Sequence, residues 1–321
     1  MTAKHTILVT GAGGAAVTAI IDNLKDAGWR VVAVDADKYA VGRLSADASY
    51  QVPLGNDAGY IAAMVDICRR EQVEIVIPLV DEELIPLCES PLAMRCLLPD
   101  KQFVRACLDK YMLFHLLQRH GINVPATCSG AEIEWDAPLP CVVKPRTGRG
   151  SRGLEFFDDI WGLRHYLRCA KAPDSLVVQR RIMGAEYTVS VICDKAGTIH
   201  GVVPKEIIVK KGITKLAVTR HNQAIDALCR VVQNELHANG PFNVQLMLDE
   251  RGIPWIFEIN PRFSTSTTLT TEAFVDEVVG LVHERLVGDY PWLRDFREGI
   301  VMARRYADTF LTEIEARKIW G

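Results

Sequence analysis

Two short segments between residues 242 and 260 carry oxygen-bearing side chains at alternating positions. They read FNVQLML and PWIFEIN, a composition typical of strands. Alternate side chains of a strand share a face, so Asn243 and Gln245 lie opposite the apolar residues of the first segment, as Glu258 and Asn260 do in the second. The expected apolar faces consist of Phe242, Val244, Leu246 and Leu248 in the first strand and of Trp255, Phe257 and Ile259 in the second.

The turn sequence Asp249-Glu250-Arg251-Gly252 predicts that these strands form a hairpin. With an even number of loop residues the two polar faces coincide, which places Gln245 diagonal to Glu258 and next to Asn260. One carboxylate and two amide oxygens are hard ligands that can hold Mg²⁺, or Mn²⁺, and leave positions for phosphate oxygens and water. We therefore expect a metal site on this face.

Arg262 strengthens this hypothesis. It follows Asn260 by two residues and supplies a planar donor fork that suits phosphate oxygens. The alternative is a solvated polar face whose strand ends at Pro261. A lone glutamate would favour that alternative, whereas Glu258 together with two amides and an arginine favours a metal and phosphate site.

A second group of candidate residues surrounds Lys144. The segment VVKPRTGRGSRG places this lysine at the end of a strand and follows it with a loop that contains Gly148, Gly150 and Gly153. Glycines let backbone N–H groups approach phosphate oxygens without a clash from Cβ, and the ammonium adds a positive charge. Taken alone, the loop could equally be a flexible hairpin tip. It indicates a phosphate site only in combination with Lys144 and the expected metal hairpin.

Several common catalytic classes lack their motifs in this chain. No G-x-x-x-x-G-K-[ST] sequence is present, so the chain is not a P-loop enzyme. Neither H-R-D nor D-F-G occurs, which argues against a protein kinase. No Ser/His/Asp or Cys/His arrangement for nucleophilic catalysis stands out.

The composition is that of a globular protein and gives no sign of a nucleic-acid or membrane partner. The 321 residues are 49% hydrophobic and 24% charged, with a net charge of −3. Gly11, Gly13 and Gly14 interrupt the apolar run near the N-terminus, which fits a strand and turn better than a signal peptide. Nine scattered cysteines without a C-x-x-C motif predict free thiols, and we therefore expect a cytoplasmic protein.

The first part of the chain alternates strands with helices. TILVT (6–10), RVVAVDAD (30–37) and EIVIPLV (74–80) are expected strands, and helical segments such as AAVTAIIDNLKDAG lie between them. Strands separated by helices predict a parallel sheet with right-handed crossovers. We assign residues 1–97 to an N-terminal parallel α/β domain.

The remainder has more antiparallel character. A helix near 109–121 leads to short strands around the lysine loop, which we assign to a small domain of residues 98–183. Long β runs at 186–193 and 198–209, followed by the metal hairpin, indicate a C-terminal unit of residues 184–321. The predicted fold class is therefore α/β followed by α+β.

Taken in order, these segments resemble the motifs of ATP-grasp enzymes. The resemblance rests on DKY at 109–111, VVKPRTGRGSRG at 142–153, VVQRRIMGAEYTVSV at 177–191, FNVQLML at 242–248 and IFEINPRFSTST at 256–267. The chain is most similar to the large-chain branch of carbamoyl-phosphate synthases and to its small carboxylate–amine ligase relatives. The resemblance covers nearly the whole chain, and E-x-N-P-R is its most specific motif. It implies a pre-ATP-grasp domain followed by a two-subdomain ATP-grasp fold.

The resemblance also implies roles for individual residues. Lys110 and Lys144 would bind ATP phosphates, with Lys144 and Arg262 acting on the transferring phosphoryl group. Backbone groups of residues 179–182 would contact adenine, and Glu186 would hold the ribose hydroxyls. The implied nucleotide-binding set is Lys110, Lys144, Thr147, Gly148, Gly150, Gly153, Gln179, Arg180, Ile182 and Glu186. The implied magnesium ligands are Gln245, Glu258 and Asn260.

One position departs from the pattern common in the family. Gln179 stands where a glutamate is frequent, so the contact of this side chain beside adenine is altered. Gln245 agrees with the carbamoyl-phosphate branch, whereas many other relatives have a second glutamate at this position. The glutamine lowers the negative charge of the expected metal site without removing its ligands.

The implied activity is that of an ATP- and magnesium-dependent ligase. A substrate carboxylate would attack the γ-phosphorus of ATP, and an amine would displace phosphate from the resulting acyl phosphate. The expected partners are therefore a small-molecule acid and a small-molecule amine. A non-catalytic nucleotide-binding subunit is the alternative, although retention of both lysines and of all three metal ligands argues against it.

The N-terminal glycines suggest a further alternative. GAGG follows the first expected strand and Asp35 lies near the end of the second, as in a dinucleotide-binding fingerprint with Ala16 at the third glycine position. An NAD-dependent oxidoreductase would explain this pattern but would leave the metal hairpin unexplained. By resemblance, the domain instead closes one side of the active site and shapes the acceptor pocket.

Other charged residues keep two interpretations. Asp81–Glu83 follow a strand at the ligand-binding edge of the sheet and could receive an amine, but acids at the start of a helix are equally expected. Lys205, Arg220 and His221 either reach substrate or phosphate or are solvated charges. The sequence identifies neither substrate, and a homodimer is plausible.

Overall fold

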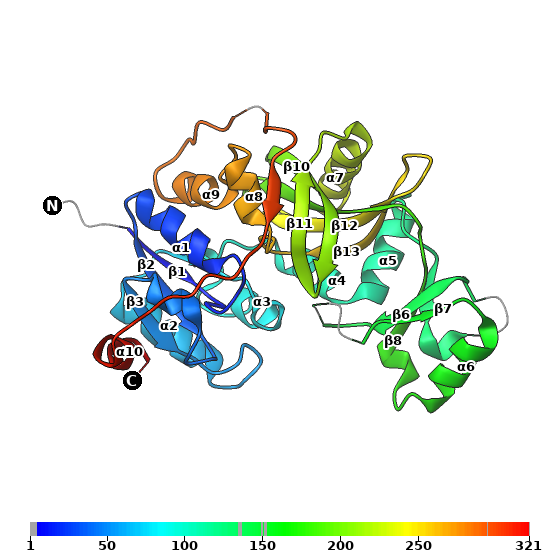
Figure 1. Cartoon of the computed structure of the whole chain (residues 1–321), viewed down its shortest axis with the longest axis horizontal. Helices are drawn as coiled ribbons and strands as arrows, with labels where there is room; N and C mark the ends of the chain where they lie inside the picture. The colour runs from blue at the N-terminus through cyan, green and yellow to red at the C-terminus, as the bar shows by residue number, and fades with distance from the viewer. Residues whose placement is uncertain (1–4, 134–136, 149, 151–152, 294, 321) are drawn as a thin grey trace.

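The computed structural model describes residues 5–133, 137–148, 150, 153–293 and 295–320. The strands of these residues form three separate sheets, one parallel and two antiparallel (Figure 1). Across the same residues, no helix is both long and apolar enough to span a membrane.

The first sheet is parallel and has the strand order β3-β2-β1-β4. Its strands are β1 (Thr6–Val9), β2 (Arg30–Asp35), β3 (Ala48–Gln51) and β4 (Ile75–Ile77), and its helices are α1 (Val17–Asp26), α2 (Tyr60–Arg70) and α3 (Asp81–Cys88). Every residue of β1 and β4 is buried, because the sheet is covered on both faces. This explains why the strands read as continuous apolar runs.

The second sheet is small and antiparallel, with the order β5-β8-β6-β7. Two helices, α4 (Lys101–Leu108) and α5 (Lys110–Arg119), precede it. The sheet contains β5 (Thr127–Ser129), β6 (Cys141–Pro145), β7 (Glu155–Phe157) and β8 (Leu176–Arg180), with α6 (Ile160–Cys169) packed against it. The lysine-and-glycine loop therefore joins β6 to β7.

The third sheet is antiparallel, with the order β13-β12-β9-β10-β11-β14. It contains β9 (Ala185–Cys193), β10 (Ile199–Lys211), β11 (Ile213–Thr219), β12 (Phe242–Leu248), β13 (Pro254–Asn260) and β14 (Val301–Ala303). Its helices are α7 (Gln223–Leu236), α8 (Thr267–Glu272) and α9 (Glu277–Leu286). The metal hairpin, β12–β13, forms one edge of this sheet.

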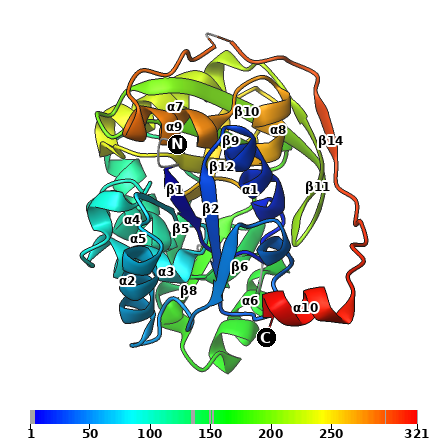
Figure 2. The ribbon, with the colours of Figure 1, turned by 90° about the vertical axis from the view of Figure 1, so that its left-hand side faces the viewer.

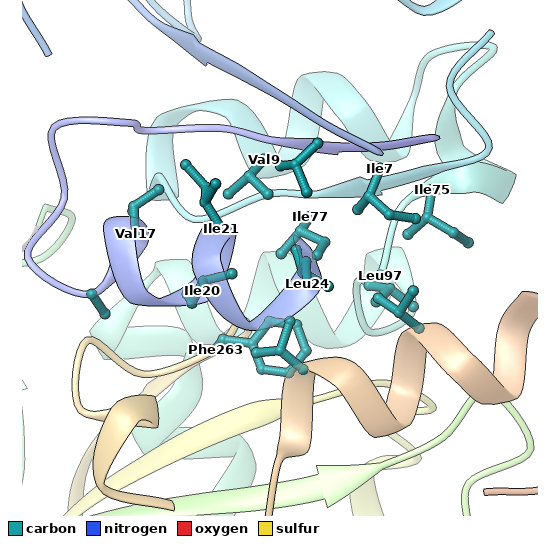
Figure 3. Packing of buried hydrophobic residues seen from close by; sticks show 14 of the residues in the cluster. Ile7, Val9, Val17, Ile20, Ile21, Leu24, Ile75, Ile77, Leu97 and Phe263 are labelled. Atoms are coloured by element: carbon teal, nitrogen blue, oxygen red, sulfur yellow. The ribbon is translucent and has the colours of Figure 1, made fainter. Parts of the chain in front are cut away.

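An apolar cluster joins the first sheet to the third part of the chain. Phe263, which directly follows Arg262, is 2% exposed and belongs to the cluster that also contains Ile20 and Leu24 of α1 (Figure 3). Leu281 of α9 belongs to the same cluster. The segment that leaves the metal hairpin is therefore anchored in the core of the N-terminal sheet.

The C-terminal segment returns to the N-terminal sheet. After β14 the chain runs along the outside of the molecule to α10 (Glu313–Trp320), which lies beside the first sheet (Figures 1 and 2). There Trp320 packs edge-on against Tyr39, and Arg43 donates to the carbonyl of Ile319 at 2.7 Å.

These observations confirm the predicted fold class, a parallel α/β unit followed by mixed units with antiparallel sheets. The divisions at residues 97/98 and 183/184 stay predictions.

Lys205 lies inside a buried polar network and lines none of the three cavities described below, so both sequence interpretations of it, contact with substrate or phosphate and a solvated charge, are wrong. It is 0% exposed and donates to Ser190 Oγ at 2.8 Å, and Ser190 donates to Glu277 Oε1 at 2.8 Å. Thr270 donates to the same carboxylate oxygen at 2.7 Å. Burial lowers the pKa of Lys205 to about 8, against the opposing effect of the Glu277 charge. The network ties β9 and β10 to α8 and α9.

We expect Lys205→Met to lower the free energy of unfolding by about 3–5 kcal/mol, because it leaves the Glu277 carboxylate buried without its cation. Urea denaturation followed by circular dichroism measures this change. Lys171→Met, which alters an exposed lysine, is the control and should shift stability by about 0.5 kcal/mol or less. An unchanged midpoint for Lys205→Met would show that the network contributes nothing to stability.

Candidate active site

The register of the metal hairpin differs from the expected one. Five residues, 249–253, separate the last paired residues of the strands, so the expectation of an even-numbered loop is wrong. A register shift between Gln245 and Leu246 follows, and it leaves Phe257 as an extra residue in β13. Beyond this bulge, Gln245 lies directly opposite Glu258 instead of diagonal to it.

The bulge also changes which residues of β13 face the core. Ile256 and Ile259 are the buried pair, at 0% and 1% exposure, because one extra residue between them inverts the alternation. The prediction that Trp255 and Phe257 share the apolar face is therefore wrong. Phe257 lines a cavity instead. In β12 the prediction is confirmed, since Phe242, Val244, Leu246 and Leu248 pack in the core.

A cavity of about 450 Å³ lies between the small sheet and the third sheet. Phe257 and Met247 form part of its apolar wall, and Glu258 lies at one side. The residues of the implied nucleotide set that line it are Lys110, Lys144, Thr147, Gly148, Gly150, Gln179, Arg180, Ile182 and Glu186. Gly153 is not among the lining residues; a Cβ there would lie 3.3 Å from Pro145. Arg149, Ser151 and Arg152 of the same loop lie outside the described residues.

Lys144 is buried at the end of β6 and faces this cavity. Its Nζ donates to Gln179 Oε1 and to the carbonyl of Phe257, both at 3.0 Å. Burial lowers its pKa to about 7; the Glu258 charge opposes this shift, and Lys110 adds to it. Gln179 in turn donates to Thr127 at 2.9 Å. The glutamine that departs from the family pattern thus holds the lysine in place.

Lys110 connects the start of α5 to the glycine loop. Its Nζ donates to the carbonyl of Gly148 at 2.7 Å, and its backbone N–H donates to the carbonyl of Arg146 at 2.9 Å. Asp109 caps the helix and forms an ion pair with Arg146 at 2.8 Å. The DKY motif therefore fixes both ends of the contact between helix and loop.

Lys210 is a candidate residue that sequence reasoning missed. It lies at the end of β10, and its Nζ is 2.5 Å from Glu186 Oε1 and 3.5 Å from Gln245 Oε1. It lines both the first cavity and an adjacent one. The only available sequence signal was a pair of lysines at the end of a long β run, which is common at solvent-exposed strand ends.

The adjacent cavity, of about 440 Å³, contains the predicted metal ligands. Gln245, Glu258, Asn260 and Arg262 line it, and Glu258 also borders the first cavity. Asn243 lines it too and accepts a hydrogen bond from Thr188 at 2.8 Å. One carboxylate and several amide oxygens on one face form a donor set that fits Mg²⁺.

Arg262 connects this cavity to the N-terminal sheet. Its Nε forms an ion pair with Asp81 Oδ1 at 2.5 Å, and its guanidinium also donates to Asn260 Oδ1 at 3.3 Å. Asp81 is the first residue of α3, as the helix-start interpretation of these acids has it, and its carboxylate is paired with the arginine. Arg262 is 8% exposed and already oriented.

Glu83 has a structural role. It is buried and accepts hydrogen bonds from Tyr60 Oη at 2.6 Å, from Thr10 Oγ1, and from the backbone of Leu79 and Val80 at 3.0 Å. Burial raises its pKa, and these donors oppose the shift. The third acid, Glu82, lines the first cavity.

The N-terminal glycine loop lines a third cavity of about 340 Å³, which shares Arg262, Ser264 and Thr265 with the second. Asp35 borders it, but its two oxygens accept from the backbone N–H groups of Gly13 and Asp37 at 2.8 Å. The carboxylate therefore stabilises the turn itself. This arrangement does not support the dinucleotide-binding alternative, in which the carboxylate would bind a ribose.

Arg304 was also missed, and it connects the walls of the second and third cavities. It donates to the carbonyls of Ala15 at 2.5 Å, Thr265 at 2.8 Å and Thr214 at 3.2 Å. Nothing in the C-terminal sequence indicates these contacts, which join three distant segments. Arg220 and His221, by contrast, line none of the three cavities.

Two family models match the chain over regions that include this site. The model of the ATP-grasp domain matches residues 107–266, and the model of the PylC-like N-terminal domain matches residues 7–94. The chain belongs to the ATP-grasp superfamily. This confirms the family resemblance and gives no support to the oxidoreductase alternative.

Individual ATP-grasp proteins are similar at lower identity. A D-alanine–D-alanine ligase of Methylacidiphilum infernorum is 31% identical over 170 residues, which cover 47% of this chain and 54% of that one. The matched regions span 38% and 54% of the lengths of two curated relatives, which is less than two thirds of each.

Solved structures share the fold of this ATP-grasp chain. An L-amino acid ligase from Bacillus licheniformis has a TM-score of 0.71 at 16% identity, over 89% of this chain and 75% of that one. An N5-carboxyaminoimidazole synthetase from Staphylococcus aureus, complexed with ADP, has a TM-score of 0.72 at 17% identity, over 90% and 79%.

We predict that nucleotide affinity falls as pH rises through about 7. The ammonium of Lys144 is favoured by nearby phosphates, so binding raises its pKa above the value of about 7 in the free protein. Between these two values binding takes up a proton, and it therefore weakens as pH increases; below both values the affinity of this group for phosphate is constant. Titration calorimetry with Mg·ADP at pH 6–9, in buffers of different ionisation enthalpy, measures the uptake.

Lys144→Arg is the matched variant, because a guanidinium stays charged over this range. It should bind nucleotide without the proton uptake. Equal uptake in both proteins would assign the titration to another group.

Proposed function

We propose that this chain is an ATP- and magnesium-dependent ligase that joins a carboxylate to an amine through an acyl phosphate. The observation that most supports this proposal is the position of Glu258. This residue borders both the first and the second cavity and faces Gln245 across the hairpin. A cation held there would lie between a bound nucleotide and an acceptor.

The first cavity is the proposed ATP site. Lys110 and Lys144 supply positive charge on the side of the glycine loop, and Lys210 supplies it on the side of the third sheet. Phe257 and Met247 offer apolar surface for a base. Glu186 is proposed to receive the ribose hydroxyls once Lys210 turns from it toward phosphate.

Glu258, Gln245 and Asn260 are the proposed magnesium ligands, with Asn243 on the same face as a further amide. Magnesium, when bound there, would neutralise phosphate charge and orient the terminal phosphates. The site carries one carboxylate, so phosphate oxygens are needed to complete the charge around the ion. Metal and nucleotide are therefore expected to bind together.

In the proposed first step, a carboxylate oxygen of the substrate attacks the γ-phosphorus in line, and the bond between that phosphorus and the β–γ bridging oxygen breaks to release ADP. Arg262 and Lys144 offset charge on the transferring group. Asp81 and Asn260 hold the guanidinium of Arg262 in place, so little reorganisation accompanies the step.

In the proposed second step, an amine attacks the acyl carbon and loses a proton, and the acyl C–O bond breaks to release phosphate. The third cavity, beside the glycine loop, is the proposed acceptor pocket, because it reaches Arg262 and shares no lining residue with the first cavity. Closure of the small sheet over the first cavity would exclude water from the acyl phosphate.

Relatives and chemistry agree with this proposal. Two similar proteins are ligases by name, a D-alanine–D-alanine ligase and an L-amino acid ligase. None of the nine cysteines, all of which the structure describes, forms a disulfide, and most are at least partly buried, which is compatible with the reducing cytoplasm where we place the enzyme. The oxidoreductase alternative is not retained.

We expect Glu258→Gln to reduce turnover by about a hundredfold or more, because it removes the only carboxylate of the proposed metal set. ADP release from pools of carboxylates and amines identifies the substrates and then measures the variant. Glu250→Gln changes an exposed acid in the loop of the same hairpin and should leave turnover unchanged. Near-normal activity of Glu258→Gln would contradict the metal assignment, and nucleotide binding without ADP release from any pool would favour a non-catalytic subunit.

A second measurement tests the acyl phosphate. Oxygen-18 placed in the substrate carboxylate should appear in the released phosphate, because the oxygen that attacks phosphorus leaves with it. Mass spectrometry of the phosphate detects one labelled oxygen per turnover. Unlabelled phosphate would exclude this route while leaving ATP binding intact.

A further inference from the structure

A second cluster of metal-ligating side chains lies outside the three cavities of the active site. Asp194, His200 and Glu284 offer one imidazole nitrogen and two carboxylate oxygens that all lie within 4.8 Å of one another. None of these residues lines the cavities proposed for nucleotide, metal and acceptor. The proposed ligase reaction makes no use of them.

Local backbone geometry directs two of these side chains toward each other. His200 is the extra residue of a bulge in β10, since Ile199 pairs with Cys193 whereas Gly201 pairs with Ile192. Such a bulge re-aims a side chain. Asp194 follows β9, and its Oδ1 accepts from the N–H of Thr198 at 2.8 Å, which leaves Oδ2 toward the imidazole.

The separations within the cluster suit a small divalent cation. His200 Nε2 is 3.0 Å from Asp194 Oδ2 and 3.3 Å from Glu284 Oε1. The edge of a tetrahedron with metal–ligand bonds of about 2.0–2.1 Å is roughly 3.3 Å. The same atoms would also form a simple ion triad around a protonated histidine. The distances alone therefore do not distinguish a metal site from such a triad, and a second observation is required.

That observation is the other oxygen of Glu284. Oε2 is buried and has no hydrogen-bond partner among the described residues, although Oε1 accepts from Trp292 Nε1 at 2.7 Å. A buried carboxylate oxygen without a partner is costly, and an ion is one of the few groups that satisfies it. A protonated His200 satisfies Oε1 alone, because its Nε2 faces that oxygen, whereas an ion that Glu284 binds through both carboxylate oxygens satisfies Oε2 as well.

The surroundings would hold such an ion rigidly. The imidazole stacks on Trp292 with ring centroids 4.8 Å apart and an interplanar angle of 17°. Trp292 itself lies against Gly280 of α9, where any Cβ would meet the indole at 2.3 Å. A cavity of about 280 Å³ borders Asp194 and Glu284 and gives room for a water ligand and for entry.

We propose that Asp194, His200 and Glu284 bind one Zn²⁺ that fastens α9 to the β9–β10 hairpin. An imidazole with two carboxylates suits a first-row divalent ion better than Mg²⁺, which prefers oxygen ligands alone. The two carboxylates balance the charge of the ion while His200 is neutral. Because α9 packs on α1, the ion stabilises the contact between the N-terminal sheet and the third sheet.

The test uses the whole 321-residue chain with two background substitutions that remove other possible zinc ligands. Cys169→Ser removes an exposed thiol 3.9 Å from His165, and Glu258→Gln removes the acid of the proposed magnesium site. After treatment with a chelator, the protein is dialysed against zinc alone and its zinc is measured by mass spectrometry. We expect about one zinc per chain and a melting temperature that rises with zinc concentration. The Co²⁺-loaded protein should show the strong visible absorption of a four-coordinate site.

His200→Gln and Glu284→Gln should each weaken zinc binding at least tenfold and remove the zinc-dependent rise in melting temperature. His283→Gln changes a neighbouring histidine of α9 outside the cluster and should behave as the parent. Less than about 0.1 zinc per chain in the parent, or equal zinc binding in His200→Gln, would overturn the proposal. These zinc measurements do not bear on the proposed ligase activity. That activity is measured in protein that keeps Glu258, whereas zinc binding is measured in a parent that lacks it.

Discussion

The bulge at Phe257 determines the geometry on which the rest of the site depends. A five-residue loop without the bulge would pair Glu258 with Val244 and turn the carboxylate into the core. Burying that charge without a partner would cost several kcal/mol, so the bulged register is strongly favoured. The same distortion points the Phe257 carbonyl at Lys144 and its ring into the first cavity. One inserted residue thus orients the proposed metal ligand Glu258, the buried lysine and part of the cavity wall.

The cations of the site differ in whether a carboxylate is paired with them before any ligand binds. Lys210 and Arg262 are paired with Glu186 and Asp81. Among the described residues, Lys144 Nζ donates only to an amide oxygen and a carbonyl, and burial lowers the pKa of this lysine. A phosphate group would therefore meet no competing carboxylate at Lys144, or at Lys110, which donates to the Gly148 carbonyl, whereas at Lys210 and Arg262 it must compete with one.

Strand periodicity predicted the polar face of the hairpin, because alternation is a local property, and the order of strands and helices predicted the parallel sheet. The bulge was not predictable in this way. It depends on a loop held by Asp249, whose Oδ1 accepts from the N–H groups of Arg251 and Ile253, and on core burial that only the folded sheet provides. Lys205 and Lys210 share one strand, yet one is buried beside Ser190 and the other faces two cavities. The local sequence around the two lysines does not predict which of them is buried and which faces the cavities.

The walls of the site are joined unequally, and this indicates which of them can move. Phe263 shares a core with α1, Arg262 is paired with Asp81, and Arg304 links Ala15 to Thr265, so the N-terminal sheet and the third sheet form one unit. The apolar cluster of the small sheet contains only residues between 128 and 178. Separating that sheet from the others would break polar contacts such as the Lys144–Phe257 bond but little apolar packing. Opening of the first cavity by the small sheet is therefore the least costly rearrangement, and it would leave unchanged the third cavity, which no residue of the small sheet or its glycine loop lines.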